Sequence, residues 1–282
     1  MNSLLRCIWI LLLIVLPNEI LASASFVGSK VCSECHQDLY ENWLESGHHL
    51  QLREAEVAKE SDLSLPEGYT WHDVSYVIGG VNKKASYVDK DGFLITSSKS
   101  GARAKTLYVL EEDSWLDFFP GEKKPFDCAY CHTTGYRSQG HQNNLPGVKG
   151  SWEEDGIGCE ACHGPGSEHA ENPRKSMHFG ELDATICESC HQRGGISNKP
   201  LTDSGLLRHH DQIAELKMGA HKGLSCLNCH NPHKKAAMAK RNCTICHSRM
   251  FSSFKANIHG REGIECIDCH MARVPKSAIS RV

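Results

Sequence analysis

The apolar positions of this chain form one long run near the start and several short segments further on. Residues 7–16 are an unbroken apolar run that follows Arg6 and precedes Ala-Ser-Ala at residues 22–24. This order is typical of a secretory signal peptide, so we predict that residues 1–24 are removed and that Ser25 begins the mature chain. The run is shorter than the roughly 20 residues of a membrane-spanning helix, which leaves an uncleaved anchor as the alternative. No later stretch is apolar enough to suggest a membrane span after cleavage.

The clearest strand signals lie between residues 75 and 96. Residues 85–88 and 93–96 flank Asp89-Lys-Asp-Gly92, a hairpin turn signature, and residues 75–78 before two glycines suggest a third strand. Asp89 and Asp91 match part of a calcium loop whose other ligands are missing, so a plain turn is predicted. We expect this small β unit to act as a lid or spacer.

Residues 206–220 carry the best helical pattern, with apolar side chains at Ile213, Leu216 and Met218. The chain is rich in Gly, Pro, Ser and His. The pattern therefore predicts a mainly α fold with much irregular structure and one small β-hairpin unit.

Cysteine is the residue type with the most regular placement. Seven Cys-x-x-Cys-His motifs use every cysteine except Cys7 of the predicted signal peptide. This spacing suits haem c, whose porphyrin vinyl groups bind two thiols and whose iron binds the adjacent imidazole. The predicted attachment residues are Cys32, Cys35, Cys128, Cys131, Cys159, Cys162, Cys187, Cys190, Cys226, Cys229, Cys243, Cys246, Cys266 and Cys269. The proximal iron ligands would be His36, His132, His163, His191, His230, His247 and His270, so the expected cofactor is seven covalent haems c.

Other uses of a Cys-x-x-Cys pair explain the pattern less well. A zinc ribbon takes two pairs per metal, and a redox dithiol takes one pair near a thioredoxin-like βαβ pattern. Neither use requires a histidine after the second cysteine, whereas all seven motifs have one. A disulfide across a two-residue gap would close only a small, strained loop.

The motifs are unevenly distributed, which suggests two regions after the signal peptide. Residues 25–127 hold one motif and the β unit, and residues 128–282 hold six motifs. The motifs at Cys159, Cys226 and Cys266 each follow Gly-(Ile/Leu)-x, which indicates a partial internal repeat. We therefore expect the second region to wrap short helices around a haem array.

Composition and charge make sense only when the cofactors are included. The mature chain offers about 37 residues per haem, so much of the interior would be porphyrin and haem would act as a folding staple. The formal charge is −3, and up to fourteen haem propionates would make the holoprotein strongly acidic. Such a surface argues against nucleic acid or anionic lipid and for basic redox proteins as partners.

Eleven histidines lie outside the motifs and outnumber the expected irons. We therefore favour the interpretation that a typical histidine among them is the sixth ligand of a haem iron. His210 and His221, eleven residues apart, would lie about 16 Å apart on one side of the predicted helix and serve two irons. His209 would point about 100° away from that side and is therefore the weaker candidate for an iron ligand. His233, three residues after the fifth motif, would serve a neighbouring haem.

Several stretches resemble the multihaem cytochromes typified by the tetrahaem electron acceptor of hydroxylamine oxidoreductase. These stretches are Cys32-x-x-Cys35-His36 with Trp43-Leu-Glu-Ser-Gly-His48, Cys128 to Tyr136, Gly158 to His169, Cys226 to His233, and His259 to Met271. His163-Gly-Pro-Gly-Ser-Glu-His169 is the most specific of them. The chain departs from the family by carrying seven motifs where the type has four. The resemblance implies the distal ligands His48, His169, His210, His221, His233 and His259, and a seventh stays open among His178, His141 and His72.

Two imidazoles per iron would give low-spin haems at low potential, since methionine ligation is not evident. We expect a periplasmic or extracellular electron carrier of a respiratory chain, with redox proteins as donors and acceptors, rather than an enzyme. One alternative is a reductase of a nitrogen or sulfur oxyanion or of hydroxylamine at one five-coordinate haem. Some related reductases mark that haem with Cys-x-x-Cys-Lys, which is missing from this sequence. The other alternative is a subunit of an extracellular cytochrome filament.

Overall fold

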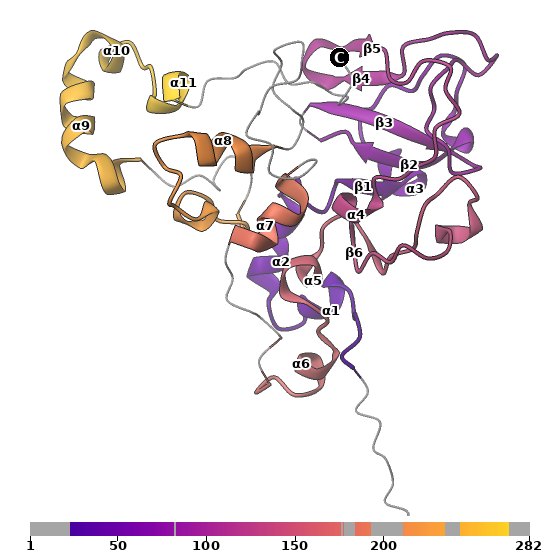
Figure 1. The fold of residues 1–282 in the computed structure, drawn as a ribbon, viewed down its shortest axis with the longest axis horizontal. Helices are drawn as coiled ribbons and strands as arrows, with labels where there is room; N and C mark the ends of the chain where they lie inside the picture. Colours follow the sequence, from indigo (N-terminus) through magenta and orange to yellow (C-terminus); the bar gives the residue numbers. More distant parts are fainter. Residues whose placement is uncertain are drawn as a thin grey trace, which may run out of the picture.

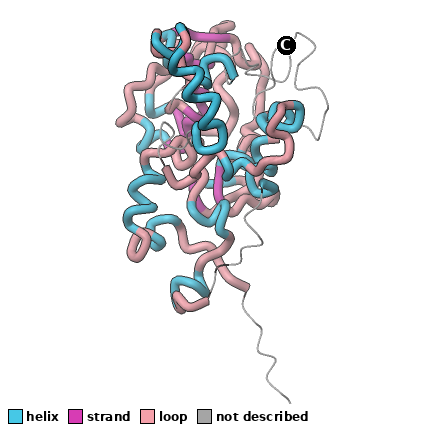
Figure 2. The backbone as a smooth tube through the Cα atoms, turned by 90° about the vertical axis from the view of Figure 1, so that its left-hand side faces the viewer, coloured by secondary structure: helices cyan, strands magenta, loops and turns pink. Residues whose placement is uncertain are grey.

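The computed structural model describes residues 23–81, 83–175, 177, 184–192, 211–234 and 243–270. Nearly all of the predicted signal peptide lies outside these residues, and so do His178, His209 and His210. An antiparallel sheet occupies one end of the molecule, and short helices and loops make up the rest (Figures 1 and 2). None of the described helices is long and apolar enough to cross a membrane.

The sheet has five strands that are neighbours in chain order, so it is a simple meander. The predicted strand at residues 75–78 is confirmed as part of β2, and residues 85–88 as part of β3. Leu52 pairs with Ile78, and Tyr76 pairs with Val88. The strands are β1 (Leu52–Glu54), β2 (Val74–Gly79), β3 (Lys84–Asp89), β4 (Leu107–Val109) and β5 (Ser114–Leu116); β6 (Thr133–Thr134) and β7 (Glu154–Asp155) form a second, two-stranded sheet.

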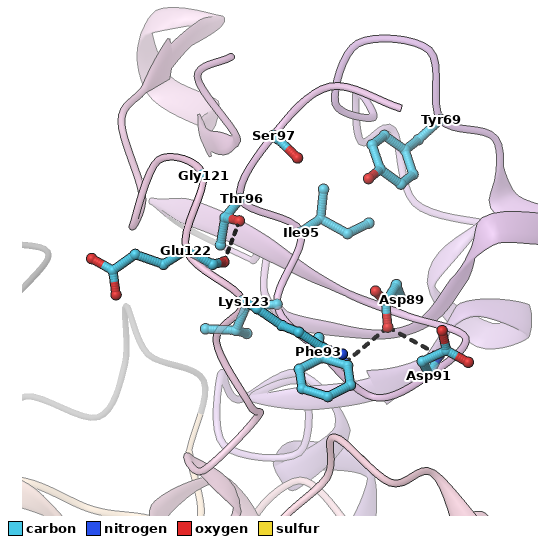
Figure 3. A pocket seen from close by; sticks show the side chains of 11 residues that line it. Tyr69, Asp89, Asp91, Phe93, Ile95, Thr96, Ser97, Gly121, Glu122 and Lys123 are labelled. Atoms are coloured by element: carbon cyan, nitrogen blue, oxygen red, sulfur yellow. Dashed lines mark hydrogen bonds between the residues drawn. The ribbon is translucent and has the colours of Figure 1, made fainter. Parts of the chain in front are cut away.

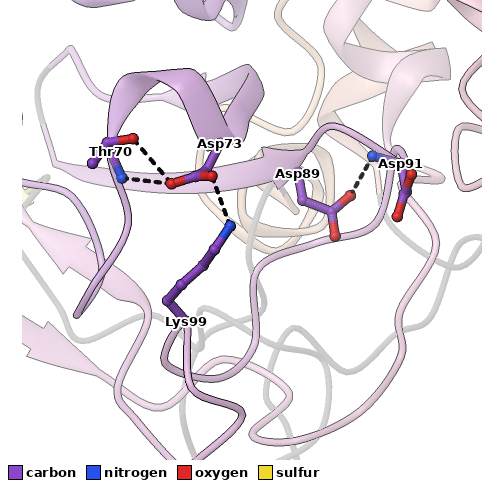
Figure 4. A network of polar contacts seen from close by, with 5 residues as sticks. All are labelled: Thr70, Asp73, Asp89, Asp91 and Lys99. Atoms are coloured by element: carbon purple, nitrogen blue, oxygen red, sulfur yellow. Dashed lines mark hydrogen bonds and ion pairs between the residues drawn. The ribbon is translucent and has the colours of Figure 1, made fainter.

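The turn after β3 is confirmed, but the predicted strand over residues 93–96 is wrong. Asp89 Oδ1 accepts the backbone N–H of Asp91 at 3.0 Å and that of Phe93 at 2.8 Å, as expected for an Asx turn (Figures 3 and 4). After the turn, the backbone N–H of Ile95 donates to the carbonyl of Tyr87 in β3, whereas the N–H of Leu94 donates to the carbonyl of Lys124. The segment therefore makes isolated bridges to two neighbours and no regular ladder.

Both faces of the large sheet are covered. Tyr76 lies in one buried cluster and Val77 in the other, because successive side chains of a strand point to opposite faces. The first cluster combines Phe126 with Ala129 and Trp152, all almost fully buried. These residues come from both sides of the predicted regional boundary at residue 127, and Ala129 belongs to the second motif. The sheet therefore anchors that motif.

Most of the described helices are short, as predicted for the haem-dense region, and α9, with 13 residues, is the exception. Three 3-10 turns, Trp71–Asp73, Leu110–Glu112 and Gln142–Asn144, accompany the sheets, and a fourth, Cys226–Asn228, begins the fifth motif. The α-helices are α1 (Ser29–Cys32), α2 (Gln37–Leu44), α3 (Ala55–Ala58), α4 (Ala129–His132), α5 (Cys159–His163), α6 (Ser167–Glu171), α7 (Ala184–His191), α8 (Gln212–Met218), α9 (Thr244–Ala256), α10 (Ile258–Arg261) and α11 (Cys266–His270).

The helix predicted over residues 206–220 is shorter than expected. It corresponds to α8, which ends at Met218 because Gly219 adopts an extended conformation with ψ 174°. Glycine is a poor helix former, so the end falls where propensity drops. His221 follows the helix, so the prediction that it lies on the helix is wrong, while its expected companion His210 lies outside the described residues.

Candidate haem-attachment and iron-ligand sites

Each described motif is built on about one helical turn. In the first motif His36 N–H bonds to the carbonyl of Cys32 at 2.9 Å, and the fifth and sixth motifs repeat this bond at 2.8 and 3.0 Å. Positions i, i+3 and i+4 of a helix lie on one face, so the two thiols and the imidazole are displayed together. This arrangement fits attachment of one porphyrin by two thioethers and one iron–imidazole bond.

Cysteines of different motifs touch, which places several attachment sites side by side. The thiols of Cys32 and Cys159 hydrogen-bond each other, which lowers the pKa of Cys159 to about 7 and raises that of Cys32. Cys131 likewise donates to Cys190 and lowers the pKa of Cys190 to about 6. Haem attachment would convert these thiols to thioethers, so the contacts matter as measures of proximity. Motif 1 adjoins motif 3, and motif 2 adjoins motif 4.

Motif 4 also adjoins motif 5. Burial and the neighbouring Cys226 together raise the pKa of Cys187 to about 11. Cys162 of motif 3 is close enough to Cys190 to raise its own pKa, after the larger effect of burial. Motifs 1 to 5 therefore form one continuous group of attachment sites.

Four of the predicted distal histidines lie against a proximal histidine of another motif. The ring centres of His36 and His169 are 6.3 Å apart, and those of His48 and His191 are 6.4 Å apart. His163 and His233 are separated by 5.7 Å, and His221 and His247 by 5.9 Å. In the third of these pairs the two Nε2 atoms face each other at 3.5 Å.

These separations fit an iron between the rings. A metal–imidazole bond is about 2 Å long, so two nitrogens across one metal are about 4 Å apart and their ring centres about 6 Å apart. All four ring separations fall within a few tenths of an ångström of that value. The residues thus fit bis-imidazole ligation of haem iron, which would supply one-electron redox chemistry at these sites.

Hydrogen bonds at Nδ1 leave Nε2 available to a metal. His132 donates Nδ1–H to the carbonyl of Gln51 at 3.1 Å, and His169 donates to that of Lys175 at 2.7 Å. His191 donates to Gln212 Oε1 at 3.2 Å. A carbonyl oxygen can only accept, so each ring carries its proton on Nδ1 and its lone pair on Nε2.

Burial favours the neutral form of two of the candidate ligand histidines. The pKa of His48 is lowered by burial and then by His191 and His49. The pKa of His163 is lowered by burial and then by His233 and His36. Metal ligation requires the neutral imidazole, so this environment favours the ligating form.

The remaining candidates are placed less informatively. His259 lies exposed on α10, and His270 ends α11. His141 is exposed and donates Nδ1–H to the carbonyl of Val148 at 2.6 Å, whereas His72 is exposed in the 3-10 turn before β2. The seventh distal ligand therefore stays open.

A cavity of about 250 Å³ lies beside the turn that follows β3 (Figure 3). Its lining includes Tyr69, Asp89, Phe93, Thr96 and Lys123, and no cysteine or histidine. It belongs to the Asx-turn region and contributes nothing to the candidate iron sites.

Comparison with known proteins finds similarity to multihaem cytochromes. Residues 31–73 and 97–164 match the family of cytochrome c554 and c-prime. The multihaem cytochrome MtrA of Shewanella baltica is 28% identical over 169 residues, which are 51% of this chain and 44% of MtrA. The dissimilatory sulfite reductase MccA of Wolinella succinogenes is 21% identical over 87% of this chain and 50% of MccA. The chain thus spans about half of the length of these relatives, or less.

Two solved structures share the fold. The outer cell wall cytochrome OcwA superposes with a TM-score of 0.62 at 19% identity, over 89% of this chain and 78% of OcwA. The octahaem sulfite reductase MccA superposes with a TM-score of 0.59 at 18% identity, over 85% of this chain and 53% of MccA. The motifs, the family match and the similarity to MtrA and MccA indicate a multihaem c-type cytochrome, and the two solved structures support the fold alone.

Proposed function

We propose that this chain is a seven-haem c-type cytochrome that transfers electrons outside the cytoplasm through mostly bis-histidine, low-potential haems. The observation that carries the proposal is the set of four histidine pairs at separations suited to a shared iron. Saturated coordination favours electron transfer over substrate binding, because a substrate needs an open position at the metal. Redox proteins would be its donors and acceptors.

The chain's own residues support this function by bringing iron sites together. Each paired distal histidine comes from the segment of another motif, so neighbouring sites are tied to one another. Thiol contacts link motifs 1 and 3, motifs 2 and 4, and motifs 4 and 5. Closely spaced redox centres are what stepwise electron transfer requires.

Export is part of the same proposal. The predicted signal peptide at residues 1–24 would direct the chain across the membrane, and thioether formation suits an exported protein. OcwA is named an outer cell wall cytochrome, which is in keeping with that location.

The test is a haem count combined with spectroscopy. Mass spectrometry of the mature holoprotein should find seven haem adducts and an N-terminus at Ser25. Electron paramagnetic resonance should give mainly low-spin signals, and potentiometric titration should place the potentials below those of a His/Met cytochrome. Free motif thiols or a dominant high-spin signal would contradict the proposal.

A reductase is the second candidate, because MccA, a sulfite reductase, matches this chain in both sequence and fold. That activity would need one five-coordinate haem, and the most direct assay offers sulfite, nitrite or hydroxylamine to the reduced holoprotein. Substrate-dependent reoxidation at steady state would favour the reductase. Slow or absent reoxidation, with rapid electron exchange with another cytochrome, would favour the carrier.

A filament subunit receives less support from the histidine contacts. His48 would be a natural ligand for an iron in the next molecule, but it lies 6.4 Å from His191 of the same chain. Electron microscopy of native material should therefore show dispersed particles, and filaments would restore the alternative.

A further inference from the structure

A buried carboxylate lies inside the third motif. Glu160, between Cys159 and Cys162, is only 2% exposed. Its oxygens accept the backbone N–H of Val27 at 3.0 and 3.1 Å, of Gly28 at 2.7 Å and of Gly166 at 2.7 Å. Three backbone donors thus converge on one side chain, which is the pattern of strong, charge-assisted hydrogen bonding.

The donors belong to the two segments that carry the first histidine pair. Val27 and Gly28 lie directly before α1, and Gly28 is its N-cap, so they lead into the motif that ends at His36. Gly166 is the N-cap of α6, the helix that holds His169. One carboxylate therefore touches the chain on both sides of the site where the ring centres of His36 and His169 are 6.3 Å apart.

Further hydrogen bonds connect the segment before α1 and the start of α1 to β7, α5 and α6. Glu154 accepts both the N–H of Ser29, at 3.2 Å, and its hydroxyl, at 2.8 Å. Ser29 Oγ in turn accepts the N–H of Cys159 at 2.9 Å. Ser25 and Ser167 exchange two further bonds, from Ser25 N–H to Ser167 Oγ at 2.9 Å and from Ser167 N–H to the Ser25 carbonyl at 3.1 Å.

We propose that Glu160 is a positioning residue for the first iron site, acting from within the third motif. It holds α1 and α6 so that His36 and His169 stand at the separation of two ligands on one metal. The inference deepens the proposed function and rests on it. Glutamine cannot replace the carboxylate, because it has one acceptor oxygen and its NH₂ group would oppose a backbone donor.

The test compares Glu160→Gln with the wild-type holoprotein in haem count and electron paramagnetic resonance. Seven haem adducts should remain, and a high-spin signal equal to about one iron in seven should appear as His169 leaves the first iron. His169→Ala should give the same signal, and the double variant should give no more than either single variant. The control is Glu171→Gln, which removes an exposed carboxylate from the same helix, α6, and should leave the spectrum unchanged.

Two outcomes would overturn the inference: an unchanged spectrum in Glu160→Gln, or a doubled high-spin signal in the double variant. If the Glu160→Gln variant does not accumulate, Glu160→Asp is measured in its place, because this variant keeps the negative charge but has a shorter side chain. It should show a smaller high-spin signal of the same kind, and a wild-type spectrum would refute the idea. A wild-type haem count below seven would contradict the proposed function and leave this test intact, provided that the first and third sites carry haem.

Discussion

Asp155 of β7 is a half-buried carboxylate whose charge should weaken the folded protein. Burial raises its pKa to about 6, and repulsion from Glu54 and Glu154 adds to the rise. Hydrogen bonds from Trp152 Nε1, at 2.6 Å, and from the backbone N–H of Glu54 oppose it. Asp155→Asn removes the charge and keeps an oxygen that accepts from Trp152 Nε1, but it loses the hydrogen bond from the Glu54 backbone. Because burial of the charge is the largest of these effects, the variant should be more stable than wild type at pH 8.

The size of the effect follows from the pKa. A rise from 3.8 to about 6 is about 2 units, and each unit is worth about 1.4 kcal/mol, which gives an upper limit of about 3 kcal/mol. Solvent reaches part of the side chain, so a gain of about 1 to 2 kcal/mol is expected. Because its pKa is raised in the folded state, the contribution of Asp155 to stability is greatest below about pH 4 and is lost as the pH rises through 6. The advantage of the variant should therefore disappear toward pH 4.

The assay is guanidinium unfolding followed by far-ultraviolet circular dichroism at pH 4, 6 and 8. Glu153→Gln is a matched control, because Glu153 is the exposed neighbour that pairs with Arg137. It should change stability by less than about 1 kcal/mol at all three pH values. A gain for Asp155→Asn that does not depend on pH, or a loss at pH 8, would refute the reasoning.

Two further substitutions test the iron sites. His233→Met should raise the reduction potential of one haem in a potentiometric titration, because methionine ligation raises the potential. A shift of about 0.1 V or more is expected, within the roughly 0.8 V range set by axial ligands. Unchanged potentials for all haems would contradict the pairing of His233 with His163. Gly156→Ala should push away the carbonyl of His49, disturb the adjacent His48 and produce a high-spin signal in electron paramagnetic resonance. Gly121→Ala is its control, because φ is +77° against +71° at Gly156 and nothing lies within 4 Å of the added carbon, so equal spectra for both variants would argue against the collision.

The sequence was most informative where chemistry fixes the spacing. The attachment cysteines and the proximal histidine of a Cys-x-x-Cys-His motif can be predicted without knowing the fold, since one helical turn places all three side chains on one face. The turn at Asp89 could be predicted for a similar reason, because its hydrogen bonds are local. The expected strand over residues 93–96 does not form, because its hydrogen-bond partners are divided between β3 and the segment at Lys124, and no local pattern encodes that division.

Long-range contacts could not be predicted from the residues alone. Glu160 occupies a variable position of its motif, and its three backbone donors are remote or follow a turn, so nothing in the sequence marks it. The resemblance supplied His169 and His48 as distal ligands but not their partners. Those partners depend on how α6 and the segment after α2 pack against other motifs.

The histidine pairs connect motifs in an order that differs from their order along the chain. His48 follows motif 1 and meets motif 4, His169 follows motif 3 and meets motif 1, and His233 follows motif 5 and meets motif 3. His221 precedes motif 5 and meets motif 6. These contacts run through motifs 4, 1, 3, 5 and 6, and the contact between Cys131 and Cys190 adds motif 2 to motif 4. Ligand binding at each of these irons would therefore fasten two distant segments, so haem attachment and folding should be coupled across the array, and damage at one motif should disturb the iron of another.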